Sequence, residues 1–166
     1  IDNVILRPSL VYGPGSRSGA GMNRLINAVE SNSIASRLHF PGKLSVVYVK
    51  DLVRLCLRAA EHPQLASRPF LVSDGVPITF GELFQILRQL LHKSSITSRR
   101  FDWLFRTIRD TYDLLDGALR ISRLIPSYLL APIGKSLSCE SVDLQQQLGF
   151  QPQYPLHLGL AETVRS

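Results

Sequence analysis

The sequence has few of the residues that build disulfide frameworks and metal sites. Its 166 residues include only two cysteines, Cys56 and Cys139, and four histidines. The cysteines lie far apart, and neither they nor the histidines stand at the spacing of metal ligands, so we expect no metal site. The two cysteines give no reason to expect an oxidising compartment. Cys56 falls in an apolar helical pattern, which predicts a buried free thiol.

Long uncharged hydrophobic runs are also missing. The most apolar late stretch, residues 101–134, is interrupted by arginine and aspartate, and no uncharged run in it reaches the roughly 20 residues that a membrane span needs. We therefore expect no integral membrane segment. The chain opens at Ile1 without a basic region or a methionine, so we expect no signal peptide and predict a cytoplasmic protein.

Motifs of several enzyme classes are absent as well. The sequence contains no P-loop and no G-x-S-x-G elbow. None of its five tyrosines has a lysine four residues later, a pair in which the lysine lowers the pKa of the phenol so that the tyrosine can move a proton. We therefore assign no catalytic residue within this chain.

What the sequence does contain is enough hydrophobic residues for a folded core, together with an excess of positive charge. Hydrophobic residues make up 45% and charged residues 19%, which is ordinary for a globular protein. The net charge is +6, but the arginines are scattered and form no stripe interleaved with aromatic residues. This pattern disfavours nucleic-acid binding and remains compatible with a small ligand that carries phosphate.

A glycine-rich segment, residues 15–21, has G-x3-G-x-G spacing between a predicted strand and a predicted helix. Such glycines could let the backbone approach a pyrophosphate at a helix N-terminus. However, Gly13 and Pro14 already end the strand, and no acidic residue follows a second strand at the distance that ribose binding requires. We therefore favour a flexible loop over a dinucleotide-binding loop.

Hydrophobic periodicity predicts alternating strands and helices, which favours an α/β fold. The expected strands cover residues 4–12, 44–49 and 70–72, with Pro8 near the end or edge of the first. Asp51 is expected to cap the second helix, and Thr79 with Glu82 has the spacing of a capping box for the third. The apolar faces predicted for the three helices are Met22, Leu25, Ile26 and Val29; Leu52, Leu55, Cys56 and Ala59; and Leu83, Ile86, Leu87, Leu90 and Leu91.

The C-terminal third is predicted to be helical. Apolar residues repeat at helical spacing over residues 101–119. A short helix is expected over residues 141–148 with Gly149 as its left-handed terminator, and a last helix over residues 156–164.

Several motifs together resemble one enzyme family. Residues 7–15, R-P-S-L-V-Y-G-P-G, resemble the R-P-x-x-V-Y-G-P-G segment of extended short-chain dehydrogenases/reductases, the NAD-dependent epimerase/dehydratase family. Residues 46–53 resemble its F-V-H-V-D-D-L-A block, and residues 70–83 resemble its Y-N-V-G-x-G … T-x-x-E-L block. Residues 148–152 and 159–164 resemble its L-G-F-x-P … G-L-x-E-T ending, so the resemblance spans nearly the whole chain.

The resemblance implies the fold class and its division. The chain would be the C-terminal part of a Rossmann-type α/β protein, with residues 1–15 and 69–75 as late strands of the parallel sheet. Residues 16–68 and 76–166 would form a small, mainly helical substrate-binding lobe. The family's G-x-x-G-x-x-G loop and its Y-x-x-x-K pair lie upstream of the R-P segment, so we expect the N-terminal dinucleotide-binding part to be absent.

The resemblance also implies ligands. The full-length parent would use NAD or NADP, whereas this chain alone is expected to bind neither. The positions whose backbone would line the nicotinamide end of the site are Pro8, Ser9 and Leu10. Tyr12 and Asn23 lie where family members meet the substrate, and Tyr48 is equally compatible with substrate contact and with the core.

The substrate stays open between a nucleotide sugar and an apolar alcohol. Sugar-nucleotide members often have an arginine shortly before the V-H-V-D-D block, whereas this chain has lysine, leucine and serine at residues 43–45. The amphipathic residues 101–130 could be an apolar lid or packing helices of the lobe.

The leading hypothesis is the substrate-binding portion of an NAD(P)-dependent epimerase, dehydratase or hydroxy-dehydrogenase, inactive alone. The alternatives are a non-catalytic binding or scaffold protein derived from this lobe, and a lipid-binding module that uses residues 101–130. Because late strands without their neighbours leave open sheet edges, we expect the chain to pair with the missing half, to form a homodimer or to aggregate.

Overall fold

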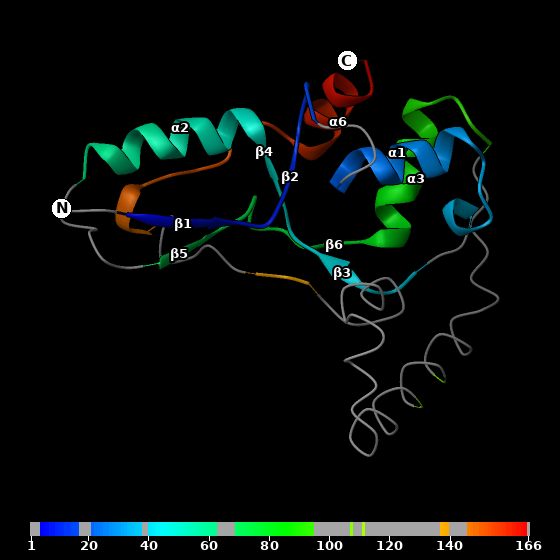
Figure 1. Cartoon of the computed structure of the whole chain (residues 1–166), viewed down its shortest axis with the longest axis horizontal. Helices are drawn as coiled ribbons and strands as arrows, with labels where there is room; N and C mark the ends of the chain where they lie inside the picture. The colour runs from blue at the N-terminus through cyan, green and yellow to red at the C-terminus, as the bar shows by residue number, and fades with distance from the viewer. Residues whose placement is uncertain are drawn as a thin grey trace. The chain divides into compact units, whose positions relative to one another are not determined.

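A computed structural model describes residues 4–16, 21–37, 40–62, 69–94, 107, 111, 137–139 and 146–165 of the chain (Figure 1). The chain divides into two compact units. The first contains residues 1–26, 45–77 and 139–166, and the second contains residues 27–44 and 78–138. Helix α1 (Gly21–Glu30) has residues in both. The predicted helix over residues 101–119 and the amphipathic stretch 101–130 lie outside the described ranges, apart from residues 107 and 111, which are helical.

The first unit is built on two pairs of parallel strands. β1 (Ile5–Pro8) pairs with β5 (Pro69–Val72), and β2 (Leu10–Tyr12) pairs with β4 (Val46–Tyr48). The single strand predicted over residues 4–12 is therefore divided, because the chain changes neighbours at Ser9. The Ser9 N–H donates to the Val72 carbonyl at 2.8 Å, and the next N–H, that of Leu10, donates to the Ser45 carbonyl at 3.3 Å. Pro8 closes β1, as its missing N–H predicts.

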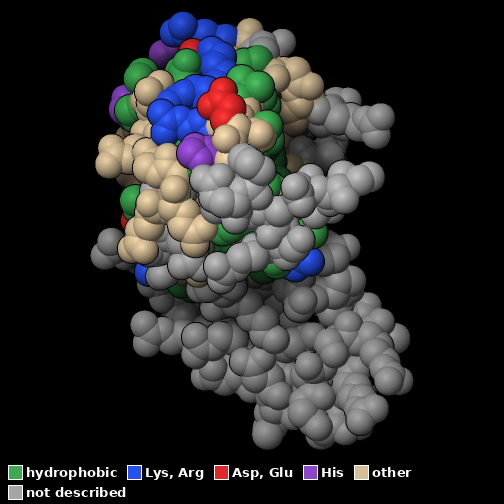
Figure 2. Space-filling model, turned by 90° about the vertical axis from the view of Figure 1, so that its left-hand side faces the viewer, with side chains coloured by type: hydrophobic (Ala, Val, Ile, Leu, Met, Phe, Trp, Pro, Cys, Tyr) green, Lys and Arg blue, Asp and Glu red, His purple; other side chains and the backbone are tan. Residues whose placement is uncertain are grey.

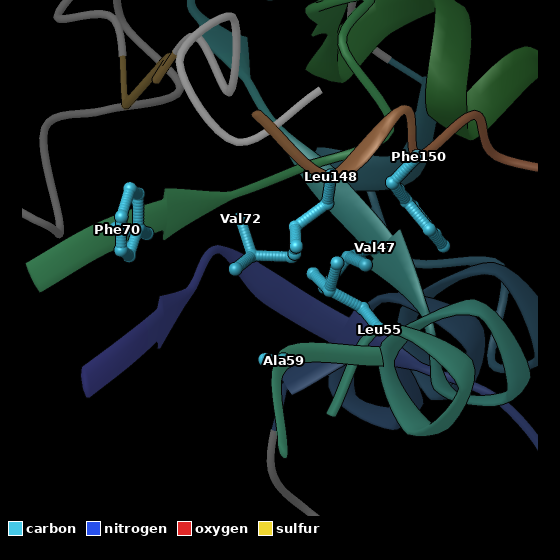
Figure 3. Close-up of a cluster of buried hydrophobic side chains, with 7 residues drawn as sticks. All are labelled: Val47, Leu55, Ala59, Phe70, Val72, Leu148 and Phe150. Carbon is cyan, nitrogen blue, oxygen red and sulfur yellow. The ribbon is translucent and has the colours of Figure 1, made fainter. Parts of the chain in front are cut away.

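Helix α2 (Val49–Ala60) covers one face of the β1–β5 pair. Leu55 and Ala59 of this helix meet Val47, Phe70 and Val72 from the strands and Leu148 and Phe150 from the C-terminal segment (Figure 3). Alternation along β5 buries Phe70 and Val72 and leaves Leu71 exposed on the opposite face. Within the described residues, the β1–β5 pair is therefore covered on the face toward α2 and exposed at Leu71 on the opposite face.

Two expectations about α2 are wrong. Cys56 is exposed, because the buried face of the helix is narrower than predicted and passes through Leu55 and Ala59 instead. Asp51 is not the cap: Tyr48 is the N-cap residue and makes no side-chain cap bond. The Asp51 carboxylate lies within the first turn and is turned toward a distant segment of the chain.

The C-terminal segment completes the first unit. Residues 146–148 are helical, and Gly149 follows in the left-handed conformation with φ +56°, as predicted for a helix terminator. The last helix, α6 (Leu156–Arg165), matches its predicted range to within one residue. Gly159 of α6 lies against Tyr12 and Tyr48, since a Cβ there would stand 3.0 Å from ring atoms of both.

The second unit contains a short antiparallel pair and a well-capped helix. β3 (Lys43–Leu44) pairs with β6 (Ile78–Thr79), and η1 (Ala35–Arg37) is a single 3-10 turn. The strand predicted over residues 44–49 is thus two separate strands, with Val49 already in α2. Helix α3 (Phe80–Leu90) begins with the predicted capping box, in which the Thr79 hydroxyl accepts from the Glu82 N–H and the Glu82 carboxylate accepts from the Thr79 N–H.

Helices α1 and α3 end in the same way. The residue two positions after each helix has a positive φ although it is not glycine, and this residue is Asn32 after α1 and His92 after α3. Arg88, which is 3% exposed, joins the two ends. Its guanidinium donates to the Asn32 side-chain oxygen at 3.3 Å and to the Ser94 carbonyl at 2.7 Å. The predicted apolar face of α3 is confirmed at Leu83 and Leu87.

Candidate functional site

Three side chains of the first unit meet at the carboxyl ends of its parallel strands. Tyr12 ends β2, Tyr48 ends β4, and Asp74 follows β5 by two residues. The carboxyl ends of parallel strands are where α/β proteins bind their ligands. The Asp74 N–H also donates to the Val46 carbonyl at 2.8 Å, which fixes the end of β5 beside the start of β4.

Tyr12 is only 1% exposed, and its hydroxyl donates to the Asp74 carboxylate at 3.4 Å. Burial raises the pKa of the Tyr12 phenol far above its ordinary value, and the negative charge of Asp74 raises it further. The phenol therefore stays protonated at physiological pH. It can donate a hydrogen bond, but it is unsuited to act as a general base.

The ion pairs within the described residues join Lys50 to Glu162 and Arg54 to Asp51, and neither includes Asp74. Burial raises its pKa to about 6, and the nearby Asp51 charge adds to this, whereas hydrogen bonds from the Tyr48 N–H (3.3 Å) and the Tyr12 hydroxyl oppose it. This carboxyl group consequently changes its charge close to neutral pH. Sequence reasoning missed it because Asp74 resembled an ordinary turn residue after a strand.

Tyr48 is fully buried, and its hydroxyl donates to the Glu162 carboxylate of α6 at 2.5 Å. Lys50 forms an ion pair with the same oxygen at 2.6 Å. The Lys50 ammonium lowers the pKa of Glu162, and the Tyr48 hydroxyl adds to this effect. The Tyr48 ring packs between Tyr12 and Tyr154, with ring centroids 5.3 and 4.9 Å away. These contacts favour the core role of Tyr48, and a substrate contact stays a prediction.

A buried carboxylate holds the C-terminal segment beside this cluster. Asp51 is 0% exposed and accepts from the backbone N–H groups of Gln153 and Tyr154, each at 3.2 Å. Arg54, one helical turn later, forms an ion pair with it at 2.7 Å. Arg58, one turn further, donates to the Leu148 carbonyl at 3.2 Å. The polar side of α2 therefore binds the segment that leads into α6.

The predicted cofactor-lining residues lie at the point where the chain passes from β1 to β2. Ser9 is the informative one, because its buried hydroxyl oxygen has no hydrogen-bond partner within the described residues. A buried hydroxyl without a partner costs about 1–3 kcal/mol, so such a group points to a partner that the described residues do not supply. Pro8 and Leu10 flank it at the end of β1 and the start of β2.

The turn after Tyr12 is held on two sides. Gly13 has φ +149°, and an added Cβ would stand 2.3 Å from the Val49 side chain, so only glycine fits there. The Asn23 amide of α1 donates to the Ser16 carbonyl at 3.0 Å. Asn23 thus binds the end of the turn, while direct contact with a substrate stays a prediction for both Asn23 and Tyr12.

Two absences hold for the part of the chain that the structure describes. No group of three or more His, Cys, Asp or Glu side chains there could hold a metal ion. None of the described helices has the length and hydropathy to cross a membrane.

A family model matches the first part of the chain. Residues 1–72 match the NAD dependent epimerase/dehydratase family. A curated relative, UDP-glucose 4-epimerase of Vibrio cholerae, is 26% identical over 164 residues, which is 98% of this chain and 46% of the relative. The chain therefore spans about half the length of this relative.

Solved structures give the same fold. MoeE5 in complex with UDP-glucose and NAD matches with a TM-score of 0.63 and 20% identity, over 98% of this chain and 46% of that protein. UDP-glucuronic acid 4-epimerase from Bacillus cereus, in complex with UDP-glucuronic acid and NAD, matches with a TM-score of 0.64 and 16% identity, over 98% of this chain and 44% of that protein. At these identities the likeness establishes the Rossmann-type α/β architecture alone.

Proposed function

We propose, on the support that these comparisons give to the NAD-dependent epimerase/dehydratase family, that this chain is the substrate-binding portion of an NAD(P)-dependent epimerase, dehydratase or hydroxy-dehydrogenase. The observation that carries the proposal is the buried, unpartnered Ser9 hydroxyl in the family's R-P segment. Ser9 directly follows the carboxyl end of β1, where its N–H bonds to the last residue of the parallel strand β5, and carboxyl ends of parallel strands form the ligand-binding edge of α/β proteins.

The residues of the R-P segment fit the nicotinamide end of a dinucleotide. The Ser9 hydroxyl can donate to or accept from a polar group such as a carboxamide, and two apolar side chains flank it in the chain, the exposed Pro8 and the partly buried Leu10. The cofactor, when bound, would supply hydride transfer. The tyrosine–lysine pair that the family uses for proton transfer would come from outside residues 1–166.

Within such an enzyme, this chain would position and enclose the substrate. Tyr12, held by Asp74 and packed under Gly159, fixes the turn formed by residues 13–16 at the strand ends. Asn23 holds the far end of this turn through Ser16. Burial keeps the Tyr12 phenol protonated, so any contribution of this residue is positional.

Nucleotide sugars and apolar alcohols both remain candidate substrates. The two structural neighbours described above bind UDP-sugars together with NAD. Against a nucleotide sugar stands the lack of an arginine before the V-V-Y-V-K-D block, where Lys43 is the nearest cation and is exposed in β3. A lysine can meet a diphosphate only as a point charge, without the bidentate geometry of arginine.

A dinucleotide-binding part is the proposed partner of the first unit. The face of the β1–β5 pair opposite α2 exposes Ile5 (43%) and Leu71 (49%), and β1 pairs only with β5 within the described residues. Parallel sheets are normally covered on both faces. A homodimer that covers this face is the competing proposal.

Calorimetric titration of NAD and NADP into the chain tests the proposal. We expect no saturable binding by the chain alone, and saturable binding once a matching dinucleotide-binding part is supplied. MoeE5, whose structure contains NAD, is the positive control. Saturable binding by the chain alone would contradict its role as a cofactor-dependent portion. No binding in either case would favour a non-catalytic scaffold.

The Ser9→Ala variant sharpens this test. It removes the unpartnered hydroxyl, so the chain alone should gain about 1 kcal/mol in free energy of unfolding. The same variant should weaken cofactor binding by the assembled protein about fivefold or more, because a hydrogen bond is lost. A loss of stability in the chain alone would show that the hydroxyl has a partner within it.

A further inference from the structure

We propose that the outer stripe of α2, formed by Val53, Cys56, Leu57 and Ala60, binds the same stripe of a second copy of this chain, with the two helices antiparallel about a two-fold axis level with Cys56 and Leu57. This inference does not rest on the proposed function. The outer stripe is also distinct from the exposed face of the β1–β5 pair, which the proposed dinucleotide-binding part would cover.

The outer stripe is a second apolar face of α2, besides the one that packs on the strands. Its four residues stand at i, i+3, i+4 and i+7, the spacing of side chains that share one face of a helix. All four are exposed, and Val53 and Leu57 are 53% and 64% exposed. Single exposed apolar side chains are common, but a contiguous row of them on a helix points to a contact with another surface.

The outer stripe is complementary to itself in size. In an antiparallel pair centred between residues 56 and 57, residue 53 of one helix faces residue 60 of the other, and residue 56 faces residue 57. Each larger side chain therefore meets a smaller one, because Val53 faces Ala60 and Leu57 faces Cys56. Alternation of large and small side chains lets two helices interdigitate. A face that complements itself fits a second copy related by two-fold symmetry, the commonest symmetry of soluble oligomers.

The charges beside the outer stripe are complementary in the same arrangement. Glu61 is exposed at the C-terminal end of α2, where the helix dipole disfavours a negative charge, and the ion pairs within the described residues do not include it. Arg54 and Lys50 precede it by seven and eleven residues, spacings that return to the same side of a helix. Since the same sides of two antiparallel helices face each other, Glu61 of each copy meets the Lys50–Arg54 end of the other.

Lys50 and Arg54 keep donors for this contact. Each is paired with an acid of its own copy, but their side chains remain 47% and 30% exposed. An ammonium has three N–H donors and a guanidinium five, so each can bind a second carboxylate. Figure 2 shows basic side chains gathered near the top of the molecule among hydrophobic and acidic ones, at the level where α2 and α6 lie in Figure 1. Exposed ion pairs of this kind fix the orientation of two surfaces more than they add affinity.

The contact is only one helix wide, so the dimer should be weak. Interfaces that bury less than about 1,000 Å² in total are weak or transient. We therefore expect a monomer at low concentration and a dimer at about 0.1 mM and above.

Sedimentation velocity of the full chain over a wide range of concentration measures the association. Leu57→Gln, a helix-compatible change at the centre of the outer stripe, should weaken it about tenfold or more, because the same apolar contact is lost twice. Leu71→Thr, a strand-compatible change on the exposed face of β5, is the matched control and should leave it unaltered. Both side chains are exposed, so both variants should fold. A chain that stays monomeric at every concentration would overturn the proposal, as would an association that only Leu71→Thr weakens.

Crosslinking through Cys56 tests the two-fold geometry. Cys139→Ser leaves Cys56 as the single thiol of the chain. In the proposed pair the two Cys56 Cα atoms lie roughly 6 Å apart, for helices about 9 Å apart. A short bis-maleimide should therefore join two copies of Cys139→Ser, and adding Leu57→Gln should lower the yield about tenfold while labelling by a monofunctional maleimide stays unchanged.

Two results of this experiment would overturn the proposal. One is an equal yield of crosslinked dimer with and without Leu57→Gln. The other is the absence of crosslinking, together with binding to phosphatidylserine–phosphatidylcholine vesicles that Leu57→Gln abolishes, which would show that the outer stripe binds a membrane surface instead. Binding of NAD by the assembled protein does not enter either result, so a failure of the proposed function leaves this test intact.

Discussion

The two units bury opposite charges and satisfy them in different ways. The first unit buries the carboxylate of Asp51, which binds two backbone N–H groups about a hundred residues away and one arginine. The second buries the guanidinium of Arg88, which binds only neutral oxygen atoms in the described residues. A carboxylate can take hydrogen bonds from the backbone of any passing segment, and so Asp51 fastens distant parts of the chain. Arg88 instead locks two nearby helix ends.

The largest expected effect is at Asp51. The Asp51→Ala variant should lower the free energy of unfolding by about 2–4 kcal/mol, because it leaves two backbone N–H groups and Arg54 without their partner. Urea unfolding measures this change. Asp51→Asn is the matched control and should cost less, since its amide oxygen still accepts from the backbone. An equal loss in both variants would show that charge, not the backbone bonds, dominates.

A smaller loss is expected at Arg88. The Arg88→Met variant keeps the aliphatic bulk but removes every donor, and should cost about 1–3 kcal/mol by the same measurement. The loss is smaller than at Asp51 because Arg37 still donates to the Asn32 side chain at 3.2 Å. Arg54→Met in the first unit is the control for removing a partly exposed arginine. An unchanged free energy of unfolding in Arg88→Met would show that the hydrogen bonds of Arg88 do not stabilise the second unit.

The first unit should also respond to pH, through Asp74. The pKa of Asp74 is raised from an ordinary 3.8 to about 6, so the folded chain favours the neutral form of this carboxyl group more than the unfolded chain does. This contribution to stability is fully present below about pH 4. Stability should fall as the pH rises from about 4 to 6 and then level off, by about 1–2 kcal/mol after allowance for partial exposure to solvent. Urea unfolding of wild type and Asp74→Asn across this range measures the difference, which should vanish below pH 4.

The smallest expected effect compares the two helix ends of the second unit. His92 has φ +53°, a conformation that glycine adopts without strain, so His92→Gly should raise the free energy of unfolding by about 0.5–1 kcal/mol. Asn32→Gly relieves the same strain but also removes the acceptor of Arg88, and should be destabilising. Thermal unfolding resolves the two. The same sign in both would mean that the Asn32–Arg88 contact contributes nothing measurable.

Local features of the fold could be predicted from the sequence. The capping box at Thr79, the terminator at Gly149 and the range of the last helix are confirmed, because each depends on residues within one or two turns. The alternation of strands and helices is confirmed for the same reason. The R-P segment was recognised from its own residues, and the family match covers it.

Features that depend on distant partners could not be predicted. The first strand is divided at Ser9 because β5 lies beside its first half and β4 beside its second half. Cys56 is exposed because the other elements cover a different face of α2. The role of Asp51 was assigned to its own helix because the two backbone N–H groups that it binds are more than a hundred residues away. Glu162 was missed for a similar reason, since its contact with Tyr48 spans 114 residues.

The change of neighbours at Ser9 sets a limit on how the sequence can vary in length. Two consecutive N–H groups, those of Ser9 and Leu10, are committed to two different strands. Adding or deleting one residue there would turn every following side chain of β2 to the opposite face, including Tyr12. In related proteins, loops elsewhere can lengthen or shorten. The number of residues from Ile5 to Gly13 should stay constant wherever these strand ends keep the same neighbours.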